Sequence, residues 1–208
     1  MMAIRRLIRT AAFGLGLAAL AGCSALTSLG AASQPLDTFE LTPLLASSTG
    51  ATRGRRHLEV TMPTATGALT SERIVIKPTP LQVQALPNAR WVNEATEMVQ
   101  LLLVRSLSGT GRFGLVTRDG AGPAADYTLI TDLQAFQTEI GPDGPAVIIR
   151  TRMSLLRGPD DTILASRSFS NTVMVSGTET TTVVSGFDQA MSAQLRDVTD
   201  WLIRNTGG

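Results

Sequence analysis

The chain has 208 residues, of which 43% are apolar and 17% charged, a balance that excludes a disordered protein and allows one domain with a substantial core. Its formal charge is +1, but three of its 18 basic residues lie before residue 23, and the remaining 15 face 17 acidic residues, which leaves no electrostatic footprint for nucleic acid. One cysteine and one histidine exclude an internal disulfide and the usual zinc ligand sets.

The N-terminus has the order of features found in a secretory signal. Arg5, Arg6 and Arg9 precede an apolar run over 11–22. This run is shorter than the roughly 20 residues needed to span a bilayer, and its length and flanking charges are typical of a signal peptide. A transmembrane anchor is therefore the weaker interpretation.

The letters "LAGC" at 20–23 resemble a bacterial lipobox. The resemblance implies cleavage between Gly22 and Cys23, and acylation of Cys23 with chains such as palmitate, which together anchor the protein to membrane lipid. A buried free cysteine is the alternative, but no core is expected at the end of a signal segment. Ser24 favours the outer membrane, with the protein facing the periplasm. The predicted organisation is a signal peptide over 1–22, a lipidated tether over 23–34 and one domain over 35–206.

Periodicity predicts the elements of this domain in chain order. Short strands are expected over 36–41, 58–63 and 73–78, followed by an extended segment over 79–91. A helix is expected from about residue 93, ended by Gly109 and Gly111. Glycine- and proline-rich turns should join three longer strands, over 126–140, 146–156 and 162–175, into an antiparallel meander. An amphipathic helix over 180–205 should close the chain.

The apolar faces of these elements predict the fold class. One face of the first long strand should hold Tyr127, Leu129, Leu133 and Ala135. The inward face of the second long strand should hold Val147, Ile149, Met153 and Leu155, and its outward face Arg150 and Arg152. The stripe of the last helix should hold Val184, Phe187, Met191, Leu195, Val198 and Leu202. We therefore expect an α+β fold, a single periplasmic domain in which two main helices pack on one face of an antiparallel or mixed sheet.

No motif in the sequence carries recognisable catalysis. The glycines over 109–114 match the spacing of a dinucleotide fingerprint, but a helix precedes them, which indicates a helix stop and turn. Asp160 and Asp161 lie in a turn, where carboxylates usually cap the backbone. Asp126 and Asp132 could in principle form a carboxylate pair. The prediction is a protein that is not an enzyme, with no catalytic residue, cofactor or metal.

The segment "LPNARW" over 86–91 is the most unusual one. Leu86, Pro87, Arg90 and Trp91 are candidates for binding a partner, because tryptophan and arginine are enriched in interface hot spots. The alternative is that Trp91 fills the core ahead of the first helix while Arg90 is solvated.

Together these features resemble the ABC-type transport auxiliary lipoproteins, which include paraquat-inducible protein C-like lipoproteins. The resemblance rests on "RIVIKP" over 73–78, "PLQV" over 80–83, "LPNARW" over 86–91, "GRF" over 111–113 and "ADY" over 125–127, with Leu129, Asp132, Leu133 and Phe136. It implies a non-catalytic docking component of a lipid transport system, partnered by a mammalian-cell-entry (MCE) domain protein and an ABC permease and ATPase. The ATPase is a separate chain, because no G-x-x-x-x-G-K-[ST] loop is present.

Two further points stay open at the level of sequence. A homo-oligomeric ring would suit a tunnel-like partner, although no residue pattern requires one. A structural lipoprotein of envelope assembly, without a transport partner, is the alternative function.

Overall fold

The computed structural model describes residues 35–44 and 54–207. The chain divides into two compact units, Met1–Leu36 and Asp37–Gly208, and the fold below is that of the second unit. The predicted signal peptide and tether, residues 1–34, lie outside the described residues.

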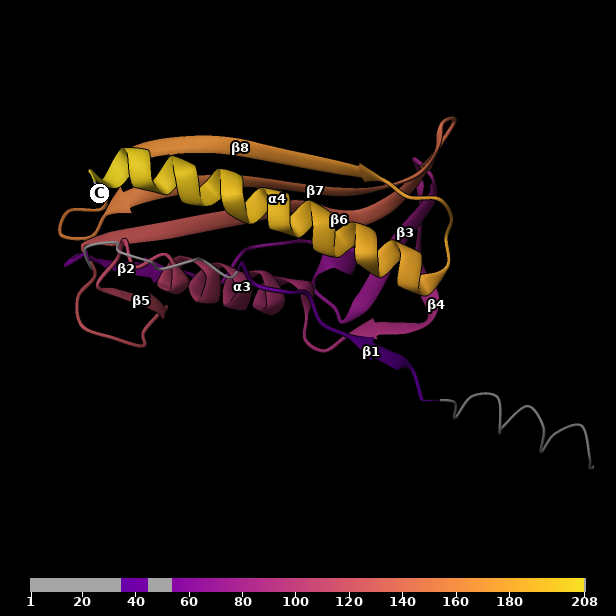
Figure 1. The fold of residues 1–208 in the computed structure, drawn as a ribbon, viewed down its shortest axis with the longest axis horizontal. Coiled ribbons are helices and arrows are strands. Elements are labelled where there is room, and N and C mark those ends of the chain that lie inside the picture. The colour runs from indigo at the N-terminus through magenta and orange to yellow at the C-terminus, as the bar shows by residue number, and fades with distance from the viewer. Residues whose placement is uncertain (1–34, 45–53, 208) are drawn as a thin grey trace, which may run out of the picture. The chain divides into compact units, whose positions relative to one another are not determined.

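The second unit contains both strands and helices, and the helices lie between the strands or after the last one along the chain (Figure 1). The strands are β1 (Asp37–Phe39), β2 (His57–Val60), β3 (Arg73–Thr79), β4 (Gln82–Trp91), β5 (Leu115–Arg118), β6 (Tyr127–Gly141), β7 (Gly144–Arg157) and β8 (Thr162–Met174). The helices are a 3-10 turn η1 (Gly67–Leu69), α3 (Ala95–Gly109) and α4 (Thr180–Thr206).

All eight strands form one open, mixed sheet built around β6. One edge of β6 pairs antiparallel with β7 over its whole length, and β7 pairs with β8, which confirms the meander. The other edge pairs in parallel with β2 at the start of β6 and with β3 near its end. Thr64 bridges to Asp132 between them. Two short strands thus lie end to end along one long strand.

The remaining strands extend the sheet from β2 and β3. β5 pairs in parallel with β2, β4 pairs antiparallel with β3, and β1 pairs in parallel with β4. The predicted α+β class with a mixed sheet and two main helices is confirmed.

A bulge explains the imperfect alternation of β6. The register between β6 and β7 shifts between Leu133 and Ala135. A bulge adds one residue to one strand and changes which side chains face the core. Leu129 and Leu133 are buried before it and Phe136 after it, so the apolar face continues in the opposite phase.

Both helices pack on the same face of the sheet, and Figure 1 shows them in front of it. Their buried side chains form one core cluster with Leu58 of β2 and the predicted inward residues of β7, which are Val147, Ile149, Met153 and Leu155. Arg150 and Arg152 are exposed on the opposite face, as predicted.

The helix boundaries differ slightly from the predicted ones. α3 begins at Ala95, because the N–H of Val92 donates to the carbonyl of Phe39 (2.9 Å) and keeps the chain in extended pairing beyond β4. It ends at Gly109, and Gly111 has a φ of 67°, which a residue without a Cβ adopts freely. In α4 the first fully buried valine is Val183 rather than Val184.

Candidate partner-binding site

Gly22 and Cys23 lie outside the described residues. Cleavage and lipidation at these positions therefore stay predictions.

The segment 86–91 forms a kink in β4. Val75 of β3 pairs with Ala85, whereas Arg73 pairs with Arg90, so two steps along β3 correspond to five along β4. Asn88 adopts a φ of 55°, in the left-handed region that asparagine tolerates better than most residues. The extra residues push part of the segment out of the regular ladder. We call the exposed part, Pro87, Asn88 and Arg90 with Glu72, the β4 kink.

Trp91 and Leu86 point into the core rather than out of the kink. Trp91 is 0% exposed and Leu86 is 3% exposed. The Trp91 ring lies edge-on to Phe187 of α4, with 5.1 Å between centroids, and 5.7 Å from the ring of Phe136. Aromatic rings at these distances stabilise a core beyond the area they bury. This geometry corrects the expectation that Leu86 and Trp91 contact a partner, and it matches the interpretation of Trp91 as a core residue.

Arg90 remains at the surface, where it forms an ion pair. Its guanidinium donates to Glu72 Oε2 at 2.6 Å, and both side chains are more than two-fifths exposed. The neighbouring backbone holds this pair in place, because the N–H of Trp91 donates to the Glu72 carbonyl at 2.7 Å. A surface pair of this kind contributes about 0–1 kcal/mol to folding, so its charges are free to serve recognition.

The sequence did not indicate Glu72 or the role of Asn88 at the kink. Glu72 precedes β3 and meets Arg90 only because the register of β3 and β4 shifts. The letters "PN" inside a strand pattern were the available signal, because proline and asparagine together favour a bend.

The other acidic candidates serve the fold in separate places. Asp126 Oδ1 accepts from Arg56 at 2.9 Å and Oδ2 accepts from the backbone N–H of His57 at 2.8 Å. The imidazole of His57 instead contacts Thr117 Oγ1 at 2.8 Å. Asp132 accepts from the Gln134 side chain. The two carboxylates therefore have different partners, and Asp126 does not orient the imidazole.

The backbone N–H of His57 and the Arg56 guanidinium hold the pKa of Asp126 below its usual range. A carboxylate with a lowered folded-state pKa stabilises the protein above its unfolded pKa of about 4 and loses that stabilisation as pH falls. We expect Asp126→Asn to lower the unfolding free energy by about 1 kcal/mol at pH 7, allowing for solvent screening. The difference from wild type should shrink between about pH 5 and pH 2, as measured by urea unfolding. A constant difference across this range would contradict the assignment.

Two negative findings apply to the part of the chain that the structure describes. No group of three or more His, Cys, Asp or Glu side chains in it could hold a metal ion. No helix in this part combines the length and the apolar character needed to cross a membrane.

Residues 39–199 match the model of the ABC-type transport auxiliary lipoprotein component family. No curated protein matches the chain.

Among solved structures, a Xanthomonas campestris protein of the DUF330 family is 26% identical, with a TM-score of 0.75 over 82% of this chain and 97% of its own. A hypothetical protein from Chlamydia trachomatis is 9% identical, with a TM-score of 0.50 over 73% of this chain and 98% of its own, which shows a shared fold alone. Because the family match covers most of the chain, this protein belongs to the ABC-type transport auxiliary lipoprotein component family.

Proposed function

We propose that this protein is a lipid-anchored docking component of an ABC-type lipid transport system, facing the periplasm, which binds an MCE-domain protein and catalyses no reaction. The single observation that carries the proposal is the family match over residues 39–199, because membership makes it an auxiliary lipoprotein of ABC-type transport. The lipid substrate, the MCE partner and the docking role go beyond that membership.

A docking role agrees with how the described polar residues are used. Ion pairs tie turns together, as Arg157 and Asp160 do with two contacts of 3.0 and 2.6 Å within one turn. Asp126 is occupied by a backbone N–H and a guanidinium. These arrangements support positioning rather than proton transfer, since a general acid or base needs a free carboxyl within reach of a substrate.

The docking surface that we propose is the β4 kink. Pro87 and Asn88 are exposed and held by a bulge, and Arg90 presents a charge that Glu72 orients. A rigid, partly charged projection loses little entropy on binding, which favours affinity.

Anchoring in this proposal depends on Cys23. Acylation of its sulfur, after cleavage behind Gly22, would hold the domain at the outer membrane, while the permease and ATPase are separate chains. A homo-oligomer is compatible with this arrangement and is not required by it.

Affinity capture from native membranes, with mass spectrometry of the retained proteins and lipids, tests the proposal. Wild type should retain an MCE-domain protein, and Cys23→Ala should lose most of it. Arg90→Glu should reduce capture several-fold, because it places a negative charge beside Glu72 and reverses the presented charge. Its melting temperature should change little, since surface pairs contribute about 0–1 kcal/mol.

Arg105→Glu is the matched control, because Arg105 forms a similarly exposed pair with Glu40 at 3.1 Å outside the kink. Equal losses for the Arg90 and Arg105 variants would exclude the kink as the docking surface. A lipidated protein that retains no transporter component would favour a structural role in the envelope.

A further inference from the structure

Two hairpin turns lie side by side at one end of the sheet. The β3–β4 turn joins Thr79 to Gln82, and the β6–β7 turn joins Gly141 to Gly144. Lys77 and Glu139 lie opposite each other just before these turns. A cavity of about 460 Å³ opens between the turns, lined mainly by their residues. We call this region the hairpin end, and Figure 1 shows the two turns projecting together.

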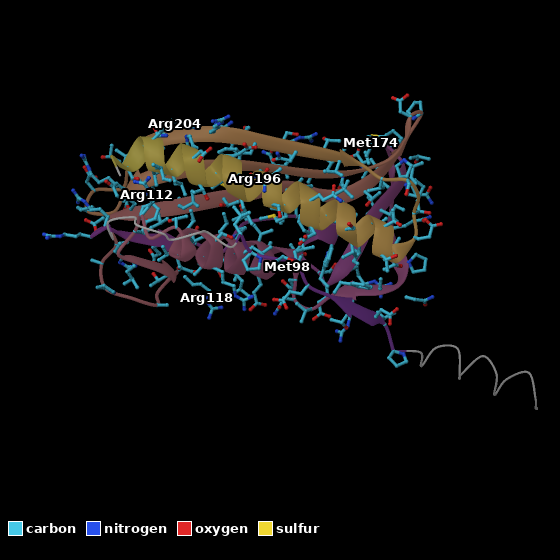
Figure 2. The ribbon with its side chains drawn as sticks, in the orientation of Figure 1. Met98, Arg112, Arg118, Met174, Arg196 and Arg204 are labelled. Atoms are coloured by element: carbon cyan, nitrogen blue, oxygen red, sulfur yellow. The ribbon has the colours of Figure 1, made fainter. Side chains whose placement is uncertain are left out.

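The hairpin end exposes large apolar side chains. Leu81, in the β3–β4 turn, is 98% exposed, and Val83 beside it is 53% exposed. Ile140 is 38% exposed in the second hairpin. Met174 is 55% exposed, and Figure 2 labels it at this end of the molecule. Isolated exposed apolar residues need no explanation, but a group of them at projecting turns marks a contact surface.

Charge is nearly absent from the β3–β4 hairpin. The twelve residues from Pro78 to Ala89 include no ionisable side chain. Lys77 lies behind the turn in register with Glu139, and Asp143 is the only charge in the neighbouring turn. These three groups carry a net charge of about −1 at neutral pH. The β3–β4 tip itself therefore presents an uncharged surface on which Leu81 and Val83 are exposed.

The length of the chain before the domain allows this tip to reach an anchoring membrane. About 14 residues separate Cys23 from Asp37, and a chain of that length spans at most about 50 Å. Asp37 pairs with Ala89 of β4. Leu81 lies eight residues before Ala89 in the same hairpin, which is at most about 26 Å in extended chain.

We infer that the β3–β4 tip, centred on Leu81, inserts into the apolar boundary of the phospholipid bilayer that holds Cys23. This inference rests on the lipid anchor of the proposed function. Insertion buries Leu81 and Val83 and adds a second contact to the acyl chains, which fixes the orientation of the domain. Because the hairpin end carries no net positive charge, insertion requires no anionic lipid.

The single cysteine makes the test direct. If Cys23 is acylated, its sulfur is blocked, so Leu81→Cys introduces the one free thiol for an environment-sensitive fluorophore. The full lipoprotein is reconstituted into phosphatidylcholine vesicles with and without doxyl-labelled lipid. Ile163→Cys is the matched control, because Ile163 is an apolar residue that is 63% exposed. It lies in the β7–β8 hairpin at the other end of β7, about 45 Å away.

The label at position 81 should shift its emission to shorter wavelengths in vesicles and be quenched by doxyl lipid. The label at position 163 should remain open to aqueous iodide. Adding anionic lipid should change neither result. Both variants should melt like wild type, since both side chains are exposed.

Two outcomes overturn the inference in different ways. If the protein floats with the vesicles but both labels are equally open to iodide, the anchor stands and the membrane contact of the tip is wrong. If the protein does not float, the anchor and the inference fail together. A position-81 label that becomes protected only when an MCE-domain protein is added would assign the tip to that protein instead.

Discussion

Trp91→Ala should lower the unfolding free energy by about 3–5 kcal/mol, the range found when a large aromatic residue is removed from a core. Trp91 is fully buried between the rings of Phe136 and Phe187, which come from β6 and α4. Its removal leaves a cavity where the sheet meets the last helix. Chemical denaturation followed by circular dichroism would measure the effect.

Trp91→Phe should cost clearly less than Trp91→Ala. Phenylalanine keeps most of the apolar volume, and it removes an indole N–H that has no hydrogen-bond partner among the described residues. A buried N–H without a partner is itself destabilising. If Trp91→Ala instead left stability intact and abolished partner capture, the assignment of Trp91 to the core would be wrong.

Gly158→Ala should be the second large effect, at about 3 kcal/mol. Gly158 lies in the β7–β8 turn, where its N–H donates to the Asp126 carbonyl at 2.8 Å. A Cβ at this position would lie against the backbone carbonyl of Ala125, far inside contact distance. Because backbone rather than a flexible side chain fills the space, the turn and the start of β6 must move apart.

Gly141→Ala is the matched control for this prediction. Gly141 also lies beside a hairpin turn, but a Cβ there would meet its nearest atom at 3.7 Å, an ordinary contact. Thermal unfolding of both variants gives the comparison. Similar melting temperatures would show that the β7–β8 turn yields easily to the added methyl group.

The local elements of the fold followed from the sequence. The meander, the helix stop at Gly109 and the inward face of β7 all depend on short-range patterns and turn residues, which are visible along the chain. The parallel pairing of β2 and β3 with β6 did not follow. Such pairing depends on which strands share a face of the core. Leu58 and Tyr127 pair although they lie far apart in the chain, and nothing in a single sequence indicates that they do.

The candidate site was predicted only in part. The segment 86–91 was identified as unusual, but its faces were not separated, because a bulge changes which side chains point inward. The positive φ of Asn88 lies at the point where the side chains of the segment separate into inward and outward ones. Arg90 stays outside and Trp91 turns inward. The partner of Arg90, Glu72, depends on strand register and so required the structure.

The central position of β6 has a consequence for how the domain is completed. Without β6, the pairing of the earlier strands falls into two separate groups, β1 with β4 and β3, and β2 with β5, and β6 is the strand that joins them. The contacts that join them link distant parts of the chain, and such contacts form slowly. In a chain that emerges N-terminus first, we therefore expect these two groups to stay unjoined until β6, which ends at Gly141, has appeared. During that time the apolar faces of these groups are exposed, a state in which chaperones protect unfinished domains.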